Sequence, residues 1–306
     1  MSNKISFVLG SDIPAAEWNQ LIYDAPNGMI YAYSWYMDMI ADDWAAIVYG
    51  DYEVVLPLVI GKKYGISYIY PPKWCQQLGF ISIDKVSSII VHEMLNAIPA
   101  QFKLVELILN SANPKVEQGN VTWNKNYELP LNDSYENIKN KYSSQIKRNL
   151  KKAEKNQLSF FENDRPENLI EMFRLHKGKD LKHLQESDYI ALKHIMYACI
   201  HKGVGKVCSV YGDKNDLLAS AFFLSYYERS VFLFSGVNSF GKQFGAMSFL
   251  IDKYLKPFAD QDHILDFEGS NDKNLARFYA GFGSEEFQYQ TVRINRLPWP
   301  IRLLKN

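Results

Sequence analysis

The sequence predicts an α+β (mixed α/β) fold of two domains, each a mixed sheet flanked by helices. The chain has 306 residues, enough for two domains, and 47% are hydrophobic against 22% charged, which indicates packed cores rather than disorder. Strand-like and helical stretches alternate without the strict βαβ order of a doubly wound sheet. Because the pattern of elements restarts near residue 135, we expect domains at 1–135 and 136–306.

In the first domain, hydrophobic periodicity separates helices from strands. Residues 85–98 form the clearest helix, because Val86 and Ile89 begin a run of apolar residues at helical spacing. Pro71-Pro72 ends the predicted strand at 67–70, since proline has no backbone N–H to donate to a neighbouring strand. The predicted helices are 15–23, 33–40 and 85–98, and the predicted strands are 5–9, 45–49, 53–60, 67–70, 104–109 and 127–131.

The second domain begins with helical signals, and Ser143 or Ser144 is expected to cap a helix that ends near Asn156. Three glycines then follow the strand at 231–235 and precede a helix that ends near Pro257. The remaining predicted helices are 167–180, 189–202, 245–255 and 273–279, and the predicted strands are 158–162, 206–211, 217–227, 231–235, 264–267 and 287–294.

Composition narrows the possible functions. The formal net charge is zero, so global charge does not indicate a nucleic-acid or membrane-surface protein. Cys75, Cys199 and Cys208 lack metal-ligand spacing and are odd in number, which is typical of a reducing compartment. The sequence shows neither a targeting segment nor an 18-residue apolar stretch. We therefore expect a cytoplasmic protein with no membrane span, no metal and no stable protein partner.

The strand at 264–267 leads into the most informative segment. Strand alternation would put Asp266, Glu268 and Ser270 on one side, beside a glycine turn. Two neighbouring carboxylates in a partly buried place can raise one pKa, and such a group can act as a base toward an amine. The alternative is that Asp266 or Glu268 caps the next helix or pairs with Arg277.

This segment also carries a family resemblance. The final-helix motif of the GCN5-related N-acetyltransferases is matched by Asn274, Ala276, Tyr279, Gly281 and Phe282. The stretch 266–283 resembles the Fem-type acyltransferases more closely, and so do Pro71-Pro72, Gln76–Gly79 and 144–153. The resemblance implies two acyl-CoA N-acyltransferase-like domains in tandem.

The resemblance also implies roles for single residues. In such acetyltransferases a tyrosine on the last helix protonates the leaving thiolate of coenzyme A, and Tyr279 has the matching position. The alternative is a core tyrosine. The loop that holds the coenzyme's pyrophosphate has Arg or Gln, two residues, Gly, one residue, then Gly or Ala. Lys242, Gly245 and Met247 fall at those places, so only the glycine matches fully. A flexible turn is the alternative.

We take Lys242, Gln243, Gly245 and Ala246 as the predicted donor-binding residues, in accord with the anion affinity of helix amino termini. The junction helix adds a basic face that includes Arg148 and Lys152. Such a face can hold a diphosphate, a nucleotide sugar or an RNA acceptor stem, although a solvated face is the alternative. The predicted substrate-binding residues are Arg148, Lys152, Ser270 and Asn274.

The functional hypothesis is an N-acyltransferase that acts on a small-molecule or cell-wall-precursor amine. A coenzyme A thioester is the favoured donor, and aminoacyl-tRNA is the less favoured one, because the long helical hairpin of tRNA-using Fem relatives is not apparent. The first domain, which lacks the glycine loop and the final motif, is then a degenerate copy for acceptor binding or scaffolding. The alternative function is a non-catalytic binding module with a degenerate acetyltransferase fold.

Overall fold

The computed structural model describes residues 4–181, 184–269 and 271–298. It divides into two compact units, which we call unit 1 (residues 4–124 and 288–298) and unit 2 (residues 125–287). The boundary expected from the sequence, at residue 135, falls inside unit 2. Residues 288–298, which were expected to belong to the second domain, lie in unit 1. The reason is strand pairing, because the last strand of the chain pairs with a strand of unit 1.

Unit 1 is built on a mixed sheet in the order β1-β2-β3-β4-β6-β13, with β5 beside β3. Neighbouring strands are antiparallel except β4 and β6, which are parallel. The strands are β1 (Ile5–Leu9), β2 (Trp44–Tyr49), β3 (Val54–Lys63), β4 (Ile66–Ile69), β5 (Ile81–Ser82), β6 (Phe102–Ile108) and β13 (Glu285–Asn295).

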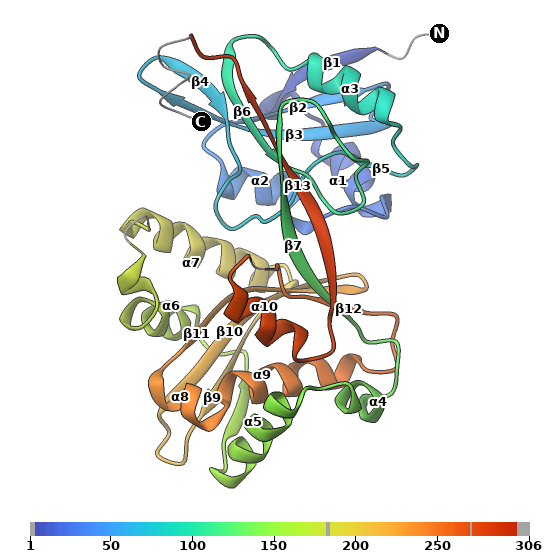
Figure 1. Cartoon of the computed structure of the whole chain (residues 1–306). Helices are drawn as coiled ribbons and strands as arrows, with labels where there is room; N and C mark the ends of the chain where they lie inside the picture. Colours follow the sequence, from blue (N-terminus) through green and yellow to red (C-terminus); the bar gives the residue numbers. More distant parts are fainter. Residues whose placement is uncertain (1–3, 182–183, 270, 299–306) are drawn as a thin grey trace. The chain divides into compact units, whose positions relative to one another are not determined.

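Three α-helices pack on the sheet of unit 1 (Figure 1). They are α1 (Ala15–Asp24), α2 (Ser34–Ile40) and α3 (Ser88–Asn96). The side chain of Ser87 caps α3, and Met94 packs in one core with Leu56 and Val105. Trp18 of α1 is fully buried against Trp44. Burial of such large side chains supplies most of the stability of a unit of this size.

The strands of unit 2 follow the order β8-β9-β10-β11-β12-β7 and are also of mixed direction. Only β11 and β12 are parallel; the other neighbours are antiparallel. The strands are β7 (Asn120–Pro130), β8 (Ser159–Glu162), β9 (Gly205–Tyr211), β10 (Leu217–Tyr226), β11 (Arg229–Val237) and β12 (Ile264–Asp266).

Helices cover both faces of the unit 2 sheet (Figure 1). One face is packed by α6, where Phe173 contacts Phe234 of β11. The other face is packed by α9, where Tyr254 stacks on Phe223 of β10. The helices are α4 (Tyr135–Asn140), α5 (Ser144–Lys155), α6 (Pro166–Leu175), α7 (Glu186–His201), α8 (Ser239–Phe244), α9 (Ala246–Leu255) and α10 (Lys273–Ala280).

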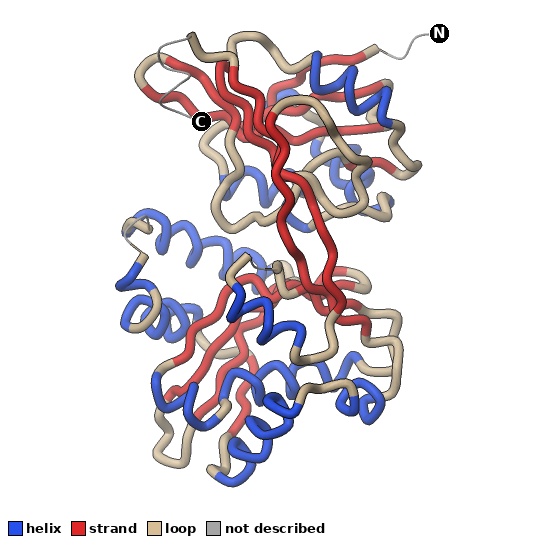
Figure 2. The backbone as a smooth tube through the Cα atoms, viewed as in Figure 1, coloured by secondary structure: helices blue, strands red, loops and turns tan. Residues whose placement is uncertain are grey.

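The two units repeat one topology. In each, four strands follow one another in antiparallel pairs, a fifth lies parallel to the fourth, and a sixth lies antiparallel to the fifth. Figure 2 shows the strands of both units in red. The chain passes from unit 1 to unit 2 within β7 and returns within β13, so each unit takes its last strand from the segment that joins it to the other. This confirms the predicted fold class of mixed sheets flanked by helices in tandem.

Most predicted elements are present, and the structure differs from the prediction in one loop and at the ends of some elements. The expected loop between Gly236 and Gly245 contains the short helix α8, which Asn238 caps by accepting from the N–H of Gly241. Strand β7 begins at Asn120, earlier than the predicted 127–131. Its first residues are mostly polar and mostly exposed, so they carry little of the hydrophobic pattern from which a strand is predicted. Among the described helices, none is both long and apolar enough to cross a membrane.

Candidate functional site

The glycine-rich turn leads from β11 through α8 into α9. Gly245 has φ +78°, and a Cβ atom there would lie 2.5 Å from the carbonyl oxygen of Asn149 in α5. Only glycine tolerates both the left-handed backbone and this close approach. As the N-cap residue of α9, Gly245 supplies no side-chain cap, which suits an anion at the first turn of that helix.

A cavity opens where β11 and β12 separate. Their parallel pairing ends at Val231 and Asp266, while β11 continues to Val237. The cavity has a volume of about 300 Å³ and reaches from the glycine-rich turn to α10. It is lined by Asn149, Phe232, Ser235, Val237, Gly241, Lys242, Gly245, Met247, Ser248, Leu275, Phe278 and Tyr279. We call it the donor cavity, because it brings the predicted Lys242 and Gly245 together with Tyr279.

Tyr279 is held rigidly at this cavity. Its ring stacks on Phe267 at 4.8 Å between centroids and contacts Phe232 at 6.3 Å. Burial raises the pKa of Tyr279, and the nearby carboxylates of Glu268 and Asp272 raise it further. The phenol therefore stays protonated at neutral pH and can act as a proton donor.

Glu268 lies in an unusual backbone conformation just beyond β12. Its φ is +54°, in the left-handed region, and its backbone N–H donates to Oδ1 of Asp266 at 2.8 Å. Gly269 follows with φ +55°, and a Cβ there would lie 2.0 Å from the carbonyl oxygen of Lys125. Burial raises the pKa of the Glu268 carboxyl well above its usual range. Strained backbone and a perturbed carboxyl together are typical of functional sites.

Asp266 has a different setting from Glu268. Its Oδ2 accepts from Nη1 of Arg229 at 2.7 Å, and the same Nη1 donates to Oε1 of Glu128 at 3.0 Å. The strand ends at Asp266, so the expected alternation does not extend to Glu268. The amino terminus of α10 is capped by Asp272, whose carboxylate accepts two backbone N–H groups, rather than by either predicted carboxylate.

The basic face of α5 borders the donor cavity. Nζ of Lys152 donates to the carbonyl oxygen of Gln243 at 3.4 Å. This hydrogen bond joins a predicted substrate-binding residue to a predicted donor-binding residue. Nη2 of Arg148 donates to Gln145 at 2.9 Å. A second cavity, of about 420 Å³, is lined by Arg148 and Asn274, two predicted substrate-binding residues. Phe278 lines both cavities, so they adjoin on α10.

Not every predicted residue lies at the cavities, since neither cavity is lined by Asp266, Glu268, Lys152 or Gln243. Ala246 is buried in the hydrophobic core of unit 2, and only its backbone can serve an anion. Ser270 lies outside the described residues. Sequence reasoning missed Asn149, whose Nδ2 donates to Ser248 at 2.9 Å across the cavity wall. The sequence signal for Asn149 was the position of its amide side chain, between the apolar and the basic faces of α5. It also missed Arg229, a lone cation in an apolar strand.

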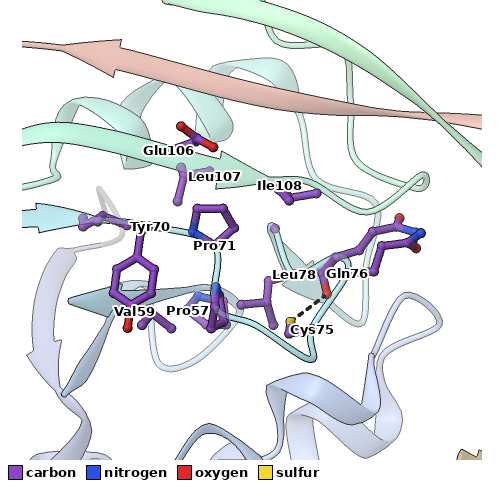
Figure 3. Close-up of a pocket in the computed structure, with 14 residues that line it drawn as sticks. Pro57, Val59, Tyr70, Pro71, Cys75, Gln76, Leu78, Glu106, Leu107 and Ile108 are labelled. Atoms are coloured by element: carbon purple, nitrogen blue, oxygen red, sulfur yellow. Dashed lines mark hydrogen bonds between the residues drawn. The ribbon is translucent and has the colours of Figure 1, made fainter. Parts of the chain in front are cut away.

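In unit 1 the region beside the parallel pair is filled. After β4 the chain turns back, and Leu78 donates its N–H to the carbonyl oxygen of Ile108 in β6 at 3.0 Å. Figure 3 shows Pro71, Leu78 and Cys75 gathered in this space. The remaining cavity has a volume of about 20 Å³, which is room for little more than a water molecule. Unit 1 thus offers no donor cavity at this position.

The three cysteines are buried, and burial raises the pKa of Cys199 and of Cys208 to about 12. Such thiols are inert rather than nucleophilic. Within residues 4–181, 184–269 and 271–298, no three His, Cys, Asp or Glu side chains gather in a way that could hold a metal ion.

Neither a family model nor a curated protein matches the sequence. Among solved structures, the chain is similar to FemX, with a TM-score of 0.66 at 12% identity over 99% of both chains. It is also similar to a conserved protein of unknown function from Bacteroides thetaiotaomicron VPI-5482, with a TM-score of 0.59 at 9% identity over 94% of this chain and 99% of that one.

A third similar structure is L-PGS from Bacillus licheniformis, with a TM-score of 0.53 at 10% identity over 95% of both chains. At these identities the likeness concerns the fold, and it extends over nearly the whole chain. Together with the repeated strand order of units 1 and 2, it shows that the chain has the fold of FemX, in which two units of one topology follow each other in tandem.

Proposed function

We propose that this chain is an N-acyltransferase that moves an acyl or aminoacyl group from an activated donor to an amine. The observation that supports this most directly is the donor cavity, which has Lys242 and Gly245 on one side and Tyr279 on the other. An anion-binding turn and a proton donor on a single cavity match the two ends of a thioester donor. The fold likeness to FemX and L-PGS agrees with this class of reaction.

A coenzyme A thioester is our favoured donor. The first-turn N–H groups of α9 and the ammonium of Lys242 suit its diphosphate, while Phe232, Leu275 and Phe278 give the cavity an apolar wall for its thioester arm. Aminoacyl-tRNA is less favoured, because the longest described helix is α7, with 16 residues, and the long hairpin of tRNA-using Fem relatives has no counterpart among the described elements.

The chemistry requires little more than orientation and two proton transfers. An acyl thioester supplies an activated carbonyl carbon. Glu268 accepts a proton from the attacking amine, Tyr279 donates one to the leaving thiolate, and a C–N bond replaces the C–S bond. Burial raises the pKa of Glu268, which makes its carboxylate a stronger base, and the raised pKa of Tyr279 keeps its proton available. Backbone N–H groups of β11 beyond Val231 suit the developing oxyanion.

We assign unit 1 a role in acceptor binding or scaffolding. Its position equivalent to the donor cavity is occupied by the segment from Tyr70 to Gly79, which supports a degenerate copy of the donor-binding unit. The acceptor in this proposal is a small-molecule or cell-wall-precursor amine.

Binding is tested by thermal shift and calorimetry with coenzyme A and acetyl-coenzyme A. We expect stabilisation of the wild-type chain and about tenfold weaker binding by Lys242→Ala, since one charged contact is lost. Lys253→Ala is the matched control, because Lys253 packs over Phe249 and does not line the cavity. If neither ligand stabilises the wild type, and no aminoacyl-tRNA does, the binding-module hypothesis replaces this one.

Turnover is tested with Glu268→Gln and Tyr279→Phe against a panel of amines. We expect each substitution to lower kcat by about 10²–10⁴-fold, as for loss of a general acid or base. Full turnover by both variants would contradict the roles given to these residues.

A further inference from the structure

Asp266, which accepts the backbone N–H of Glu268, belongs to a largely buried ion-pair network. Arg229 of β11 reaches Asp266 of β12 at 2.7 Å and Glu128 of β7 at 3.0 Å. Asp266 and Glu128 are paired in register on neighbouring strands, and their side chains are 2% and 11% exposed. Two carboxylates and one guanidinium in a buried place need all of their hydrogen bonds, so the geometry of Asp266 is tightly defined.

The second oxygen of Asp266 has a different partner. Oδ1 accepts the backbone N–H of Glu268 at 2.8 Å, two residues further along the chain. This is the local hydrogen bond by which aspartate stabilises a turn. The turn places Glu268 at φ +54°, a left-handed conformation that is unfavourable for a residue with a Cβ atom unless such a hydrogen bond supports it. Carboxylate Oδ2 is thus fixed by Arg229, and Oδ1 fixes Glu268.

We propose that Asp266 is a positioning residue whose carboxylate, fixed by the Arg229 guanidinium that it shares with Glu128, holds the left-handed backbone of Glu268 and so keeps the Glu268 carboxyl in its half-buried place beside Tyr279. The inference rests on the proposed acyl transfer, because it assigns Asp266 a part in that reaction without contact with the substrate. It replaces the proton-accepting role that the sequence suggested for Asp266.

The test measures the titration of Glu268 itself. Glutamate is labelled with ¹³C at Cδ, and Glu268→Gln identifies the Glu268 signal. In the wild type we expect Glu268 to titrate above the other glutamates. In Asp266→Ala, the carboxyl should move toward solvent and titrate about one pH unit lower or more. Asp266→Asn keeps an acceptor oxygen for the Glu268 N–H, so it should restore most of the shift.

Kinetics give a second measurement, with acetyl-coenzyme A as donor. Asp266→Ala should lower kcat about tenfold or more while KM for the donor changes less than about twofold, because the donor contacts remain. The pH at which kcat rises should fall together with the titration of Glu268. Asp164→Ala is the matched control, since Asp164 is also buried and accepts a backbone N–H, from Arg165 at 2.7 Å. Its carboxylate also accepts from Asn168 and Tyr211, not from Glu268.

The outcomes separate the inference from the proposed function. A folded Asp266→Ala in which Glu268 titrates as in the wild type overturns the inference, even if Glu268→Gln abolishes turnover. A shifted titration supports it, even if no acyl transfer is found. Should Asp266→Ala not fold, Arg229→Lys takes its place: it keeps the charge, loses the two-carboxylate contact and should lower the titration of Glu268, and an unchanged titration overturns the inference.

Discussion

At the scale of the single residue, Glu268 combines two unfavourable features. Its backbone is left-handed, and its carboxyl is largely shielded from water. Neither feature stabilises the fold, because a buried carboxyl disfavours its own charged form. The stacked and buried Tyr279 beside it shows that the surrounding core is rigid enough to hold such a group. Because Glu268 lowers the stability of the fold, replacing its carboxyl should change the stability measurably.

We predict that Glu268→Gln is more stable than the wild type at neutral pH. The folded-state pKa of Glu268 is raised above its unfolded value, so its contribution to stability is fully present below about pH 4 and is lost as pH rises. The amide has no such loss. Thermal denaturation should show a higher Tm for the variant at pH 8, by about 2–4 °C for each kcal/mol gained, and no gain at pH 4. A lower Tm at pH 8 would contradict the buried, strained setting.

His263 should make the fold sensitive to acid. Burial, and then the charge of Arg229, lowers the pKa of His263 to about 4, while its ring bonds to Ser230 at 2.8 Å. An unfolded histidine titrates near 6.5, so stability should fall as pH drops from about 6.5 to 4, by about 1.4 kcal/mol per pH unit. Urea unfolding across this range measures the slope. His263→Gln should flatten the curve, and an unchanged slope in that variant would assign the acid sensitivity elsewhere.

At the scale of the element, the turn before α9 depends on one glycine. We predict that Gly245→Ala loses about 1–3 kcal/mol of stability and most coenzyme A binding, because the new Cβ meets the backbone of α5 in a left-handed conformation. Gly203→Ala is the control: Gly203 has φ +74°, and a Cβ there would have no atom within 4 Å, so this variant suffers the conformational cost alone. Equal losses of stability and unchanged binding in both would show that the close approach to Asn149 has no importance.

The elements themselves were largely predictable. Apolar periodicity gave the helices that pack on the sheets, such as α3, and Ser143 caps α5 as expected. Helix α8 was missed because glycines in that stretch indicate a loop, whereas the Asn238 cap stabilises a short helix there. The early part of β7 was missed because its exposed polar residues carry little hydrophobic signal.

The candidate site was predictable only in part. The resemblance placed Lys242, Gly245 and Tyr279 in related roles, and the structure brings all three to one cavity, although their roles remain predictions. Alternation could not predict the separate settings of Asp266 and Glu268, since it assumes a strand through Glu268, whereas the strand ends at Asp266, two residues earlier. The partner of Asp266, Arg229, comes from a neighbouring strand, and such pairings depend on sheet order rather than on local sequence.

At the scale of the whole molecule, the two units divide within strands β7 and β13, and not near residue 135, where the pattern of predicted elements begins again. A fragment of residues 136–306 lacks β7, whose Leu129 pairs with Leu265 of β12 in the core. We predict that this fragment does not fold, whereas a fragment of residues 125–287 gives a cooperative thermal transition. Circular dichroism and proteolysis of the two fragments decide this. Stable folding of 136–306 alone would contradict the division into units 1 and 2.

The passage of β13 back into unit 1 has a consequence for synthesis on the ribosome. Residues 125–287 are complete before the strand that pairs with β6 has been translated, so the later part of the protein can acquire its structure first. Until then the nascent amino-terminal sheet exposes the unpaired backbone of β6, an edge onto which other extended chains can add. Chaperone dependence and aggregation during expression should therefore be governed by how quickly the final strand emerges.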